Sequence, residues 1–382
     1  MRNTLKPAIL SLSLLTVMAG AAVSPSLGVI AERFPEAERL LVQMVVSLPA
    51  LVIIPSLFLA TWLTRFFSRR QILLTGLVVY TAGGMGGAFS NSIMILLFFR
   101  SILGVGVGMV MPFSTSLISD FFEGEERASL MGLSSASNML GGLVALLLSG
   151  LLADISWRLP FTIYLFAIPV FLMNLKYLPE PPAHDNKFSG SSLPGRIYFL
   201  AIGMFLLNLT FFVLPPTIAL FIRENSLGNP ELTGVAISCS TAAGFLSGIF
   251  LQKTRKFTGF FHVPLMLLLM SGGFMMLHYS FVIAGVFAGN ACIGFANRSL
   301  YPMIFFKATH EIPPEQSVKV TALLSSMIYL GQFLSPIFIS VIGKFFNDTS
   351  FRFAYLFVSL VLLSGSILFA VPSIRSWRKK ST

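Results

Sequence analysis

The chain has 382 residues, of which 55% are hydrophobic and only 11% are charged. Soluble domains carry roughly 25% charged residues, so this composition excludes a water-enclosed globule and predicts a protein surrounded by lipid. The net charge of +11 does not indicate nucleic acid binding, because the cations lie in short segments between apolar runs and form no basic stripe with interleaved aromatic residues.

Apolar runs of about 20 residues, the length that a helix needs to cross a bilayer, recur along the chain. We place twelve spans at 7–30, 42–64, 72–90, 94–118, 128–152, 159–178, 196–222, 232–252, 262–279, 281–306, 319–343 and 353–372. Their unbroken apolarity excludes a β-barrel, which would alternate at every second residue. The first run is too long for a secretory signal. The sequence therefore predicts an all-α membrane protein.

The basic residues predict the orientation of these spans. With the N-terminus inside, six of the 26 Lys and Arg residues lie in outer segments, namely Arg33, Arg39, Arg158, Arg223, Lys344 and Arg352. Arg100 and Arg298 lie inside spans, and all the others lie in inner segments. We therefore expect a multi-pass protein of the plasma membrane with both termini in the cytoplasm.

The longest loop, 179–195, is polar and rich in Pro, Gly and Ser. We interpret this loop as a flexible cytoplasmic linker. It separates an N-terminal half of six helices, 1–178, from a C-terminal half of six helices, 196–382.

The two halves share residues at a spacing of 190 positions. The matched pairs include Gly104 and Gly294, Pro112 and Pro302, Glu125 and Glu315, Gly141 and Gly331, and Arg65 and Arg255. After a four-residue slip, Trp157-Arg158 resembles Phe351-Arg352. Duplicated six-helix halves are a transporter architecture. The alternative is chance alignment of common apolar residues.

The loop after the second span resembles a signature of the major facilitator superfamily. That signature reads Gly-x-Leu-Ala-Asp-Arg-x-Gly-Arg-Arg, and Leu63, Arg69 and Arg70 match it. Arg65 stands at the acidic position, which is a departure from the family pattern.

The resemblance extends over essentially the whole chain. Arg100-x-x-x-Gly104-x-Gly106 is similar to the family's fourth helix, and Gly141-Gly142 matches the end of its antiporter signature Gly-Pro-x-x-Gly-Gly. Asn138 occupies the proline position of that signature. The resemblance implies the major facilitator fold of two pseudo-symmetric six-helix halves. It also implies secondary transport by alternating access, most closely as in bacterial drug:proton antiporters for multidrug efflux.

Arg100 and Arg298 are charges buried within spans. A charge at bilayer depth costs at least about 2.5–3.5 kcal/mol, so each must face a partner or a polar cavity. One interpretation is that both arginines bind an anionic substrate. The other is that they are structural and donate to backbone carbonyls.

Proton coupling, which the resemblance implies, lacks an obvious carrier within the spans. All 15 Asp and Glu residues lie in loops or at helix ends. The four histidines, including His262, also lie at edges or in loops. Asp120 and Asp154, at span ends, are the weak candidates for the proton site.

Several polar and small residues within the spans are further candidates. Asn138, Tyr329 and Gln332 are candidate substrate-binding residues, since the resemblance places the fifth and eleventh helices beside the cavity; packing is the alternative. Close helix packing is expected from the small or kinking residues Gly104, Gly108, Pro112, Gly141, Gly142 and Pro336.

The resemblance also suggests a charge lock that closes the inner gate. It places Arg65, Arg69 and Arg70 near Glu311 and Glu315. The gating candidates further include Asp120, Glu125, Arg127 and Arg255. The alternative is that these are ordinary solvated loop charges.

The leading hypothesis is efflux of amphipathic drugs or metabolites, coupled to an ion gradient that protons are expected to supply. The alternatives are a transporter of organic anions or metabolites that uses Arg100 and Arg298, and a membrane sensor, which the chain supports least. No enzymatic activity, cofactor, metal or nucleic acid partner is expected, and no motif for ATP hydrolysis occurs. We expect a monomer whose partners are a small-molecule substrate and the lipid bilayer.

Overall fold

The computed structural model describes residues 2–181, 193–310, 312 and 316–381. These residues form α-helices and short 3-10 turns, with no β-strand among them. Ten helical segments of this part of the chain are long and apolar enough to cross a membrane. The all-α membrane class is confirmed, whereas the number of twelve crossings stays a prediction.

The difference between ten and twelve has two sources. One of the ten segments, Pro230–His278, covers both the eighth and the ninth predicted spans. The tenth predicted span is helix α12 (Ile283–His310), which is not among the ten. Asn290, Asn297 and Arg298 lower the hydropathy of α12.

Contacts divide the chain into two compact units. Unit 1 comprises Met1–Lys187 together with the short pieces Ile218–Leu220 and Asn229–Gly234. Unit 2 comprises the remainder of the chain.

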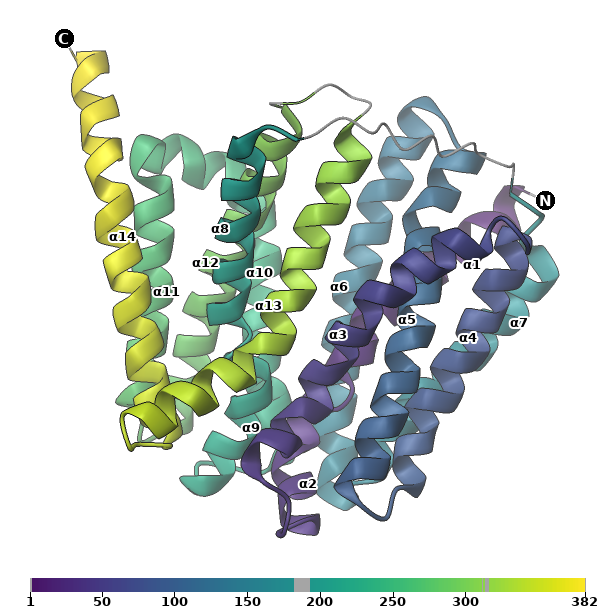
Figure 1. Cartoon of the computed structure of the whole chain (residues 1–382), viewed down its shortest axis with the longest axis horizontal. Helices are drawn as coiled ribbons and strands as arrows, with labels where there is room; N and C mark the ends of the chain where they lie inside the picture. The colour runs from purple at the N-terminus through teal and green to yellow at the C-terminus, as the bar shows by residue number, and fades with distance from the viewer. Residues whose placement is uncertain (1, 182–192, 311, 313–315, 382) are drawn as a thin grey trace. The chain divides into compact units, whose positions relative to one another are not determined.

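Unit 1 contains the helices α1 (Arg2–Ala21), α2 (Leu27–Arg33), α3 (Arg39–Leu63), α4 (Arg69–Gly86), α5 (Ile93–Phe121), α6 (Gly124–Ile155) and α7 (Ala167–Tyr177), with the 3-10 helix η3 (Leu159–Phe166) before α7. Helix α5 packs against both α3 and α4, and α1 packs along α6 (Figure 1). Glycines make the α5 contacts close, because an added Cβ at Gly104 would lie 2.8 Å from the carbonyl oxygen of Pro49 in α3. Gly106 faces the backbone of Tyr80 in α4 in the same way.

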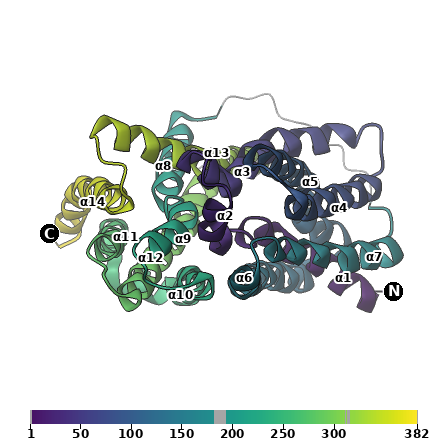
Figure 2. The ribbon, with the colours of Figure 1, turned by 90° about the horizontal axis from the view of Figure 1, so that it is seen from below.

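Unit 2 contains α12 and the helices α8 (Gly195–Phe211), α9 (Leu214–Glu224), α10 (Pro230–Thr258), α11 (His262–His278), α13 (Ser317–Phe345) and α14 (Phe351–Ser381). Helix α11 packs against α12 and α14, and α8 packs along α13. The neighbouring positions of α11 and α14 can be followed in Figures 1 and 2. Residues of α8, α12 and α13 share an apolar core that includes Met204, Ala308 and Leu324.

The first membrane helix of each half is broken at the same point of the repeat. Helix α1 ends at Ala21 and α8 ends at Phe211, which are 190 positions apart. Each break is followed by a proline, Pro25 or Pro215, which lacks the N–H that would continue the helical ladder. The first and seventh predicted spans were expected to be continuous, so these breaks are a correction.

A second contact also repeats between the units. In unit 1, Arg158 Nε donates to the carbonyl oxygen of Ala88 at 2.9 Å. In unit 2, Arg352 Nη1 donates to the carbonyl oxygen of His278 at 2.5 Å. Ala88 and His278 are again 190 positions apart. Each arginine therefore holds the backbone at the end of the third predicted span of its own half, which is α4 in unit 1 and α11 in unit 2.

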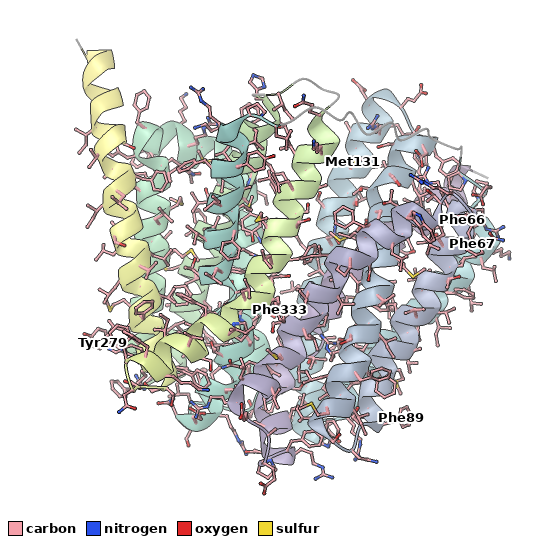
Figure 3. The ribbon with its side chains drawn as sticks, viewed as in Figure 1. Phe66, Phe67, Phe89, Met131, Tyr279 and Phe333 are labelled. Carbon is pink, nitrogen blue, oxygen red and sulfur yellow. The ribbon has the colours of Figure 1, made fainter. Side chains whose placement is uncertain are left out.

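Exposed aromatic residues mark both ends of unit 1 (Figure 3). Phe66 and Phe67 are 65% and 54% exposed at the start of α4, and Phe89 is 70% exposed beyond its end. The 18 residues of α4 span about 27 Å, close to the thickness of a bilayer core.

Candidate functional site

Arg100 of α5 is completely enclosed within unit 1, with 0% exposure. Its Nε donates to the carbonyl oxygen of Val45 at 2.6 Å, and its Nη2 donates to that of Ala19 at 3.1 Å. Its Nη1 donates to the Tyr164 hydroxyl at 2.5 Å, and that hydroxyl donates to the Ala19 carbonyl at 2.8 Å. The guanidinium thus joins α1, α3, α5 and η3.

The position of Ala19 explains why a cation is useful there. Ala19 lies in the last turn of α1, where carbonyl groups run out of helical N–H partners. A cation beside this end of a helix is favourable because the helix dipole is negative there. Arg100 therefore stabilises the break that follows Ala21.

Asn290 of α12 occupies the repeat position of Arg100, 190 residues later. Its Nδ2 donates to the carbonyl oxygen of Ala236 in α10 at 2.9 Å, matching the bond from Arg100 to Val45 in α3. Both units therefore use a polar side chain of this helix to hold the backbone of its neighbour. This correspondence favours a structural role for Arg100.

Arg298 of α12 lies in a different setting within unit 2. Its side chain is exposed, unlike that of Arg100. Its stem crosses Gly244 of α10, where an added Cβ would lie 2.6 Å from Arg298 Cγ. Because Gly244 has no side chain, the Arg298 side chain can pack directly against the backbone of α10 at this position.

Two consecutive hydrogen bonds hold the Tyr301 ring in place beside Arg298. The Arg298 guanidinium carbon lies 5.6 Å from the ring centre of Tyr301, one turn along α12. The Tyr301 hydroxyl donates to the side-chain oxygen of Asn208 in α8, and the Asn208 amide donates to the carbonyl oxygen of Ile328 in α13. Arg298 therefore presents its charge from a site that three helices hold in place.

The other substrate-binding candidates lie in both units. Asn138 of α6 is half-buried and accepts a hydrogen bond from the Thr16 hydroxyl of α1. Tyr329 and Gln332 are half-buried on α13. Asn138 and Ile328 are 190 positions apart, so the polar contact between α1 and α6 has its counterpart between α8 and α13.

Two gating candidates come together at one end of unit 1. Arg69 Nη1 lies 2.7 Å from Asp120 Oδ2, and these side chains are 16% and 5% exposed. Arg69 Nη2 also donates to Ser116 at 2.7 Å. The pair joins the first residue of α4 to the end of α5. Sequence reasoning named both residues but did not pair them, because their separation along the chain carries no signal of contact.

The remaining gating candidates lie at the ends of helices. Arg70 Nη2 donates to the carbonyl oxygen of Leu175. The side chains of Arg65, Glu125, Arg127 and Arg255 are exposed. Glu315 lies outside the described residues.

The small residues and prolines lie at close approaches and bends. An added Cβ at Gly141 of α6 would lie 2.6 Å from the carbonyl oxygen of Leu14 in α1, and one at Gly142 would lie 2.5 Å from Val17. Gly108 of α5 similarly faces Ser56 of α3. Pro112 lies within α5 and Pro336 within α13. Helix α13 bends near Phe333, where Pro336 interrupts its hydrogen bonding (Figure 3).

The burial of three ring-bearing side chains, Tyr80, Tyr164 and His262, was not predicted from the sequence. Tyr80 and Tyr164 are 1% exposed, and their ring centres are 5.7 Å apart beside Arg100. His262 of α11, which the sequence places at the edge of a predicted span, is likewise 1% exposed. Aromatic residues are frequent in every span, so no local pattern distinguished these from residues that face lipid.

A family model described as the Major Facilitator Superfamily matches residues 8–336. The Bacillus subtilis multidrug transporter protein MdtP is 29% identical over 104 residues, which are 27% of this chain and 19% of that protein. The Staphylococcus aureus quinolone resistance protein NorA is 28% identical over 114 residues, 30% of this chain and 29% of that protein. The chain therefore spans less than a third of the length of these two relatives.

Solved structures show the same fold at low sequence identity. A bacterial homologue of the human lysosomal transporter Spinster gives a TM-score of 0.76 at 17% identity, covering 99% of this chain and 98% of that one. The xylose transporter XylE from E. coli gives 0.77 at 15% identity, covering 97% and 96%. The resemblance seen in the sequence is confirmed: this chain is an integral membrane protein that belongs to the Major Facilitator Superfamily, a family of transporters rather than enzymes.

Proposed function

We propose that the chain is a secondary active transporter that exports amphipathic small molecules by alternating access, driven by an ion gradient. The observation that carries this proposal is the shared internal plan of the two units. Both have a broken first helix, an arginine that holds the turn at Ala88 or His278, and a polar donor at position 100 or 290. Duplicated halves of this kind are how transporters expose one site to each side of a membrane in turn.

The direction and the substrate class are inferred from relatives and composition. MdtP is named a multidrug transporter and NorA a quinolone resistance protein, and these names support a proposal of drug export. The chain's 38 Phe and 17 Met residues supply adaptable apolar surface for such compounds. Within this proposal, twelve helices cross the plasma membrane, both termini are cytoplasmic and the monomer is the working unit.

The proposed substrate contacts are Arg298, Asn138, Tyr329 and Gln332. Arg100 is assigned to positioning, because backbone carbonyls and Tyr164 already satisfy its guanidinium. The ion pair between Arg69 and Asp120 is proposed to stiffen the gating end of unit 1.

Efflux of ethidium from cells that overexpress the protein tests this proposal. We expect efflux above the empty-vector control, and we expect a protonophore to abolish the difference. A protein that reaches the membrane but moves no ethidium would contradict the proposed substrate class. Efflux that a protonophore leaves unchanged would contradict the proton as driving ion.

Arg298 favours a second candidate function, the transport of organic anions. Its side chain is exposed on a membrane helix, and an exposed cation at that depth requires water or an anion beside it. Chemical modification by phenylglyoxal provides the test, with the Arg298→Gln variant as control. Protection of the wild-type protein by 1-naphthoate, but not by its methyl ester, would favour the anion transporter; equal protection by both would exclude it.

A further inference from the structure

A buried histidine joins three helices of unit 2. His262 is the first residue of α11, and its Nδ1 lies 2.8 Å from the hydroxyl of Thr258, the last residue of α10. Its Nε2 lies 2.8 Å from the hydroxyl of Ser299 in α12. His262 and Ser299 are 1% and 0% exposed. Both ring nitrogens therefore have hydroxyl partners, and neither partner is itself ionisable at neutral pH.

The direction of one of these hydrogen bonds is determined by its neighbour. The Thr258 hydroxyl donates its single proton to the carbonyl oxygen of Thr254 at 2.8 Å. Towards His262 it can therefore only accept, so Nδ1 carries a proton and donates. In the neutral imidazole Nε2 is then the acceptor, and Ser299 donates to it.

Binding of a second proton to the His262 ring reverses the direction of one hydrogen bond only. Protonated Nε2 donates to the Ser299 oxygen, and the hydroxyl proton of Ser299 rotates to another acceptor. Within a helix the usual acceptor is the carbonyl four residues earlier, here that of Phe295. Both charge states of His262 thus keep all their hydrogen bonds, so a proton can be bound and released without leaving a buried polar group unpaired.

Charged groups on the neighbouring helices act on His262. Arg255 of α10 interacts electrostatically with the ring. On α12, Arg298 precedes Ser299 and Tyr301 follows it. Helix α14 contacts the start of α11 through a 2.7 Å hydrogen bond from Ser366 to the carbonyl oxygen of Pro264, and residues 366–374 contain no ionisable side chain.

We propose that His262 binds and releases the coupling ion, a proton, of the transport cycle. The inference rests on the proposed function, in which a proton gradient drives transport. A proton from the aqueous phase adds to the Nε2 lone pair, the His262–Ser299 hydrogen bond reverses, and loss of the proton restores it. Ser299 directly follows Arg298 in α12, so the hydrogen bond that reverses lies next in sequence to the residue proposed to contact substrate. Histidine suits this task because its ordinary pKa lies near neutrality.

Two transport modes separate proton coupling from substrate movement. Purified protein in proteoliposomes is assayed for ethidium accumulation under an imposed pH gradient, with the membrane potential clamped by valinomycin and potassium. The same vesicles are assayed for exchange of labelled ethidium at equal pH, which needs no net proton movement. One pH unit drives about tenfold accumulation at one proton per substrate.

We expect His262→Gln to retain exchange within about twofold and to lose accumulation, because glutamine can form both hydrogen bonds but cannot titrate. The matched control is His310→Gln, since His310 is exposed and stacks on Phe306; it should behave as wild type in both modes. Internal pyranine should report proton movement with ethidium for wild type and none for His262→Gln.

Accumulation by His262→Gln equal to that of wild type would overturn the inference. Absence of both modes in the wild-type protein would instead mean that the proposed function has failed. If His262→Gln loses both modes through misfolding, Ser299→Ala decides the question. Retained exchange with reduced accumulation in Ser299→Ala would support the inference, and full accumulation would overturn it.

Discussion

The arginines within the membrane helices differ in what satisfies their charge. Arg100 is enclosed and donates to two carbonyl oxygens and one phenol. Arg298 is exposed, and its guanidinium lies over the aromatic ring of Tyr301. The sequence offered the same pair of interpretations for both residues, whereas the structure places them in different surroundings.

Replacement of Arg100 tests the structural assignment. Arg100→Ala should lower the free energy of unfolding by on the order of 3 kcal/mol, because buried carbonyls at Ala19 and Val45 lose charged donors. Arg100→Lys should recover only part of this loss, since an ammonium lacks the planar fork that reaches all three acceptors. Thermal unfolding in detergent measures both, with exposed Arg33→Ala as control. Unchanged stability combined with lost substrate binding would contradict the assignment.

At the scale of helices, the positions of most spans followed from the length and apolarity of the runs. The breaks after Ala21 and Phe211 did not, because Pro25 and Pro215 lie in runs that are otherwise uninterrupted. Their effect depends on partners elsewhere in the fold, such as Arg100 beside Ala19. The hydrogen bonds of His262 were unpredictable for the same reason: they depend on which faces of α10, α11 and α12 meet.

Two glycines on α6 test how closely its helix contact is packed. Gly141→Ala should destabilise unit 1 by about 1–3 kcal/mol, because its Cβ would meet the Leu14 carbonyl of α1 at 2.6 Å. Gly132→Ala has nothing within 4 Å of its Cβ and should be neutral or up to about 1 kcal/mol more stable. Thermal unfolding of the two variants in the same detergent compares them directly. Equal stabilities would show that α1 and α6 are not closely packed at Gly141.

At the scale of the whole molecule, the repeated plan of the two units is the basis for alternating access. The repeat was visible in sequence as matched residues 190 positions apart, and the contacts at Ala88 and His278 give it a structural meaning. The arrangement of charges that closes the gate was not predictable to the same degree. Arg69 pairs within unit 1 with Asp120, a partner that the family resemblance alone did not suggest.

The proposed charge lock between Arg65 and Glu315 predicts a specific rescue. Glu315→Arg should weaken the lock and raise the labelling, by a membrane-impermeant maleimide, of a single cysteine introduced on the cytoplasmic side of the cavity. Adding Arg65→Glu should restore labelling to the wild-type level, because the pair is then reformed with reversed charges. Exposed pairs contribute only about 0–1 kcal/mol each, so shifts of a few fold are expected. A double variant that labels like Glu315→Arg alone would refute the pairing.

Ethidium transport in proteoliposomes that contain only this protein tests directly whether a proton gradient drives export. With the membrane potential clamped, ethidium should move up its concentration gradient only when protons can flow in the opposite direction. The accumulation ratio should rise with the imposed pH difference. Ethidium that merely equilibrates across the membrane, whatever the pH difference, would contradict proton-driven export.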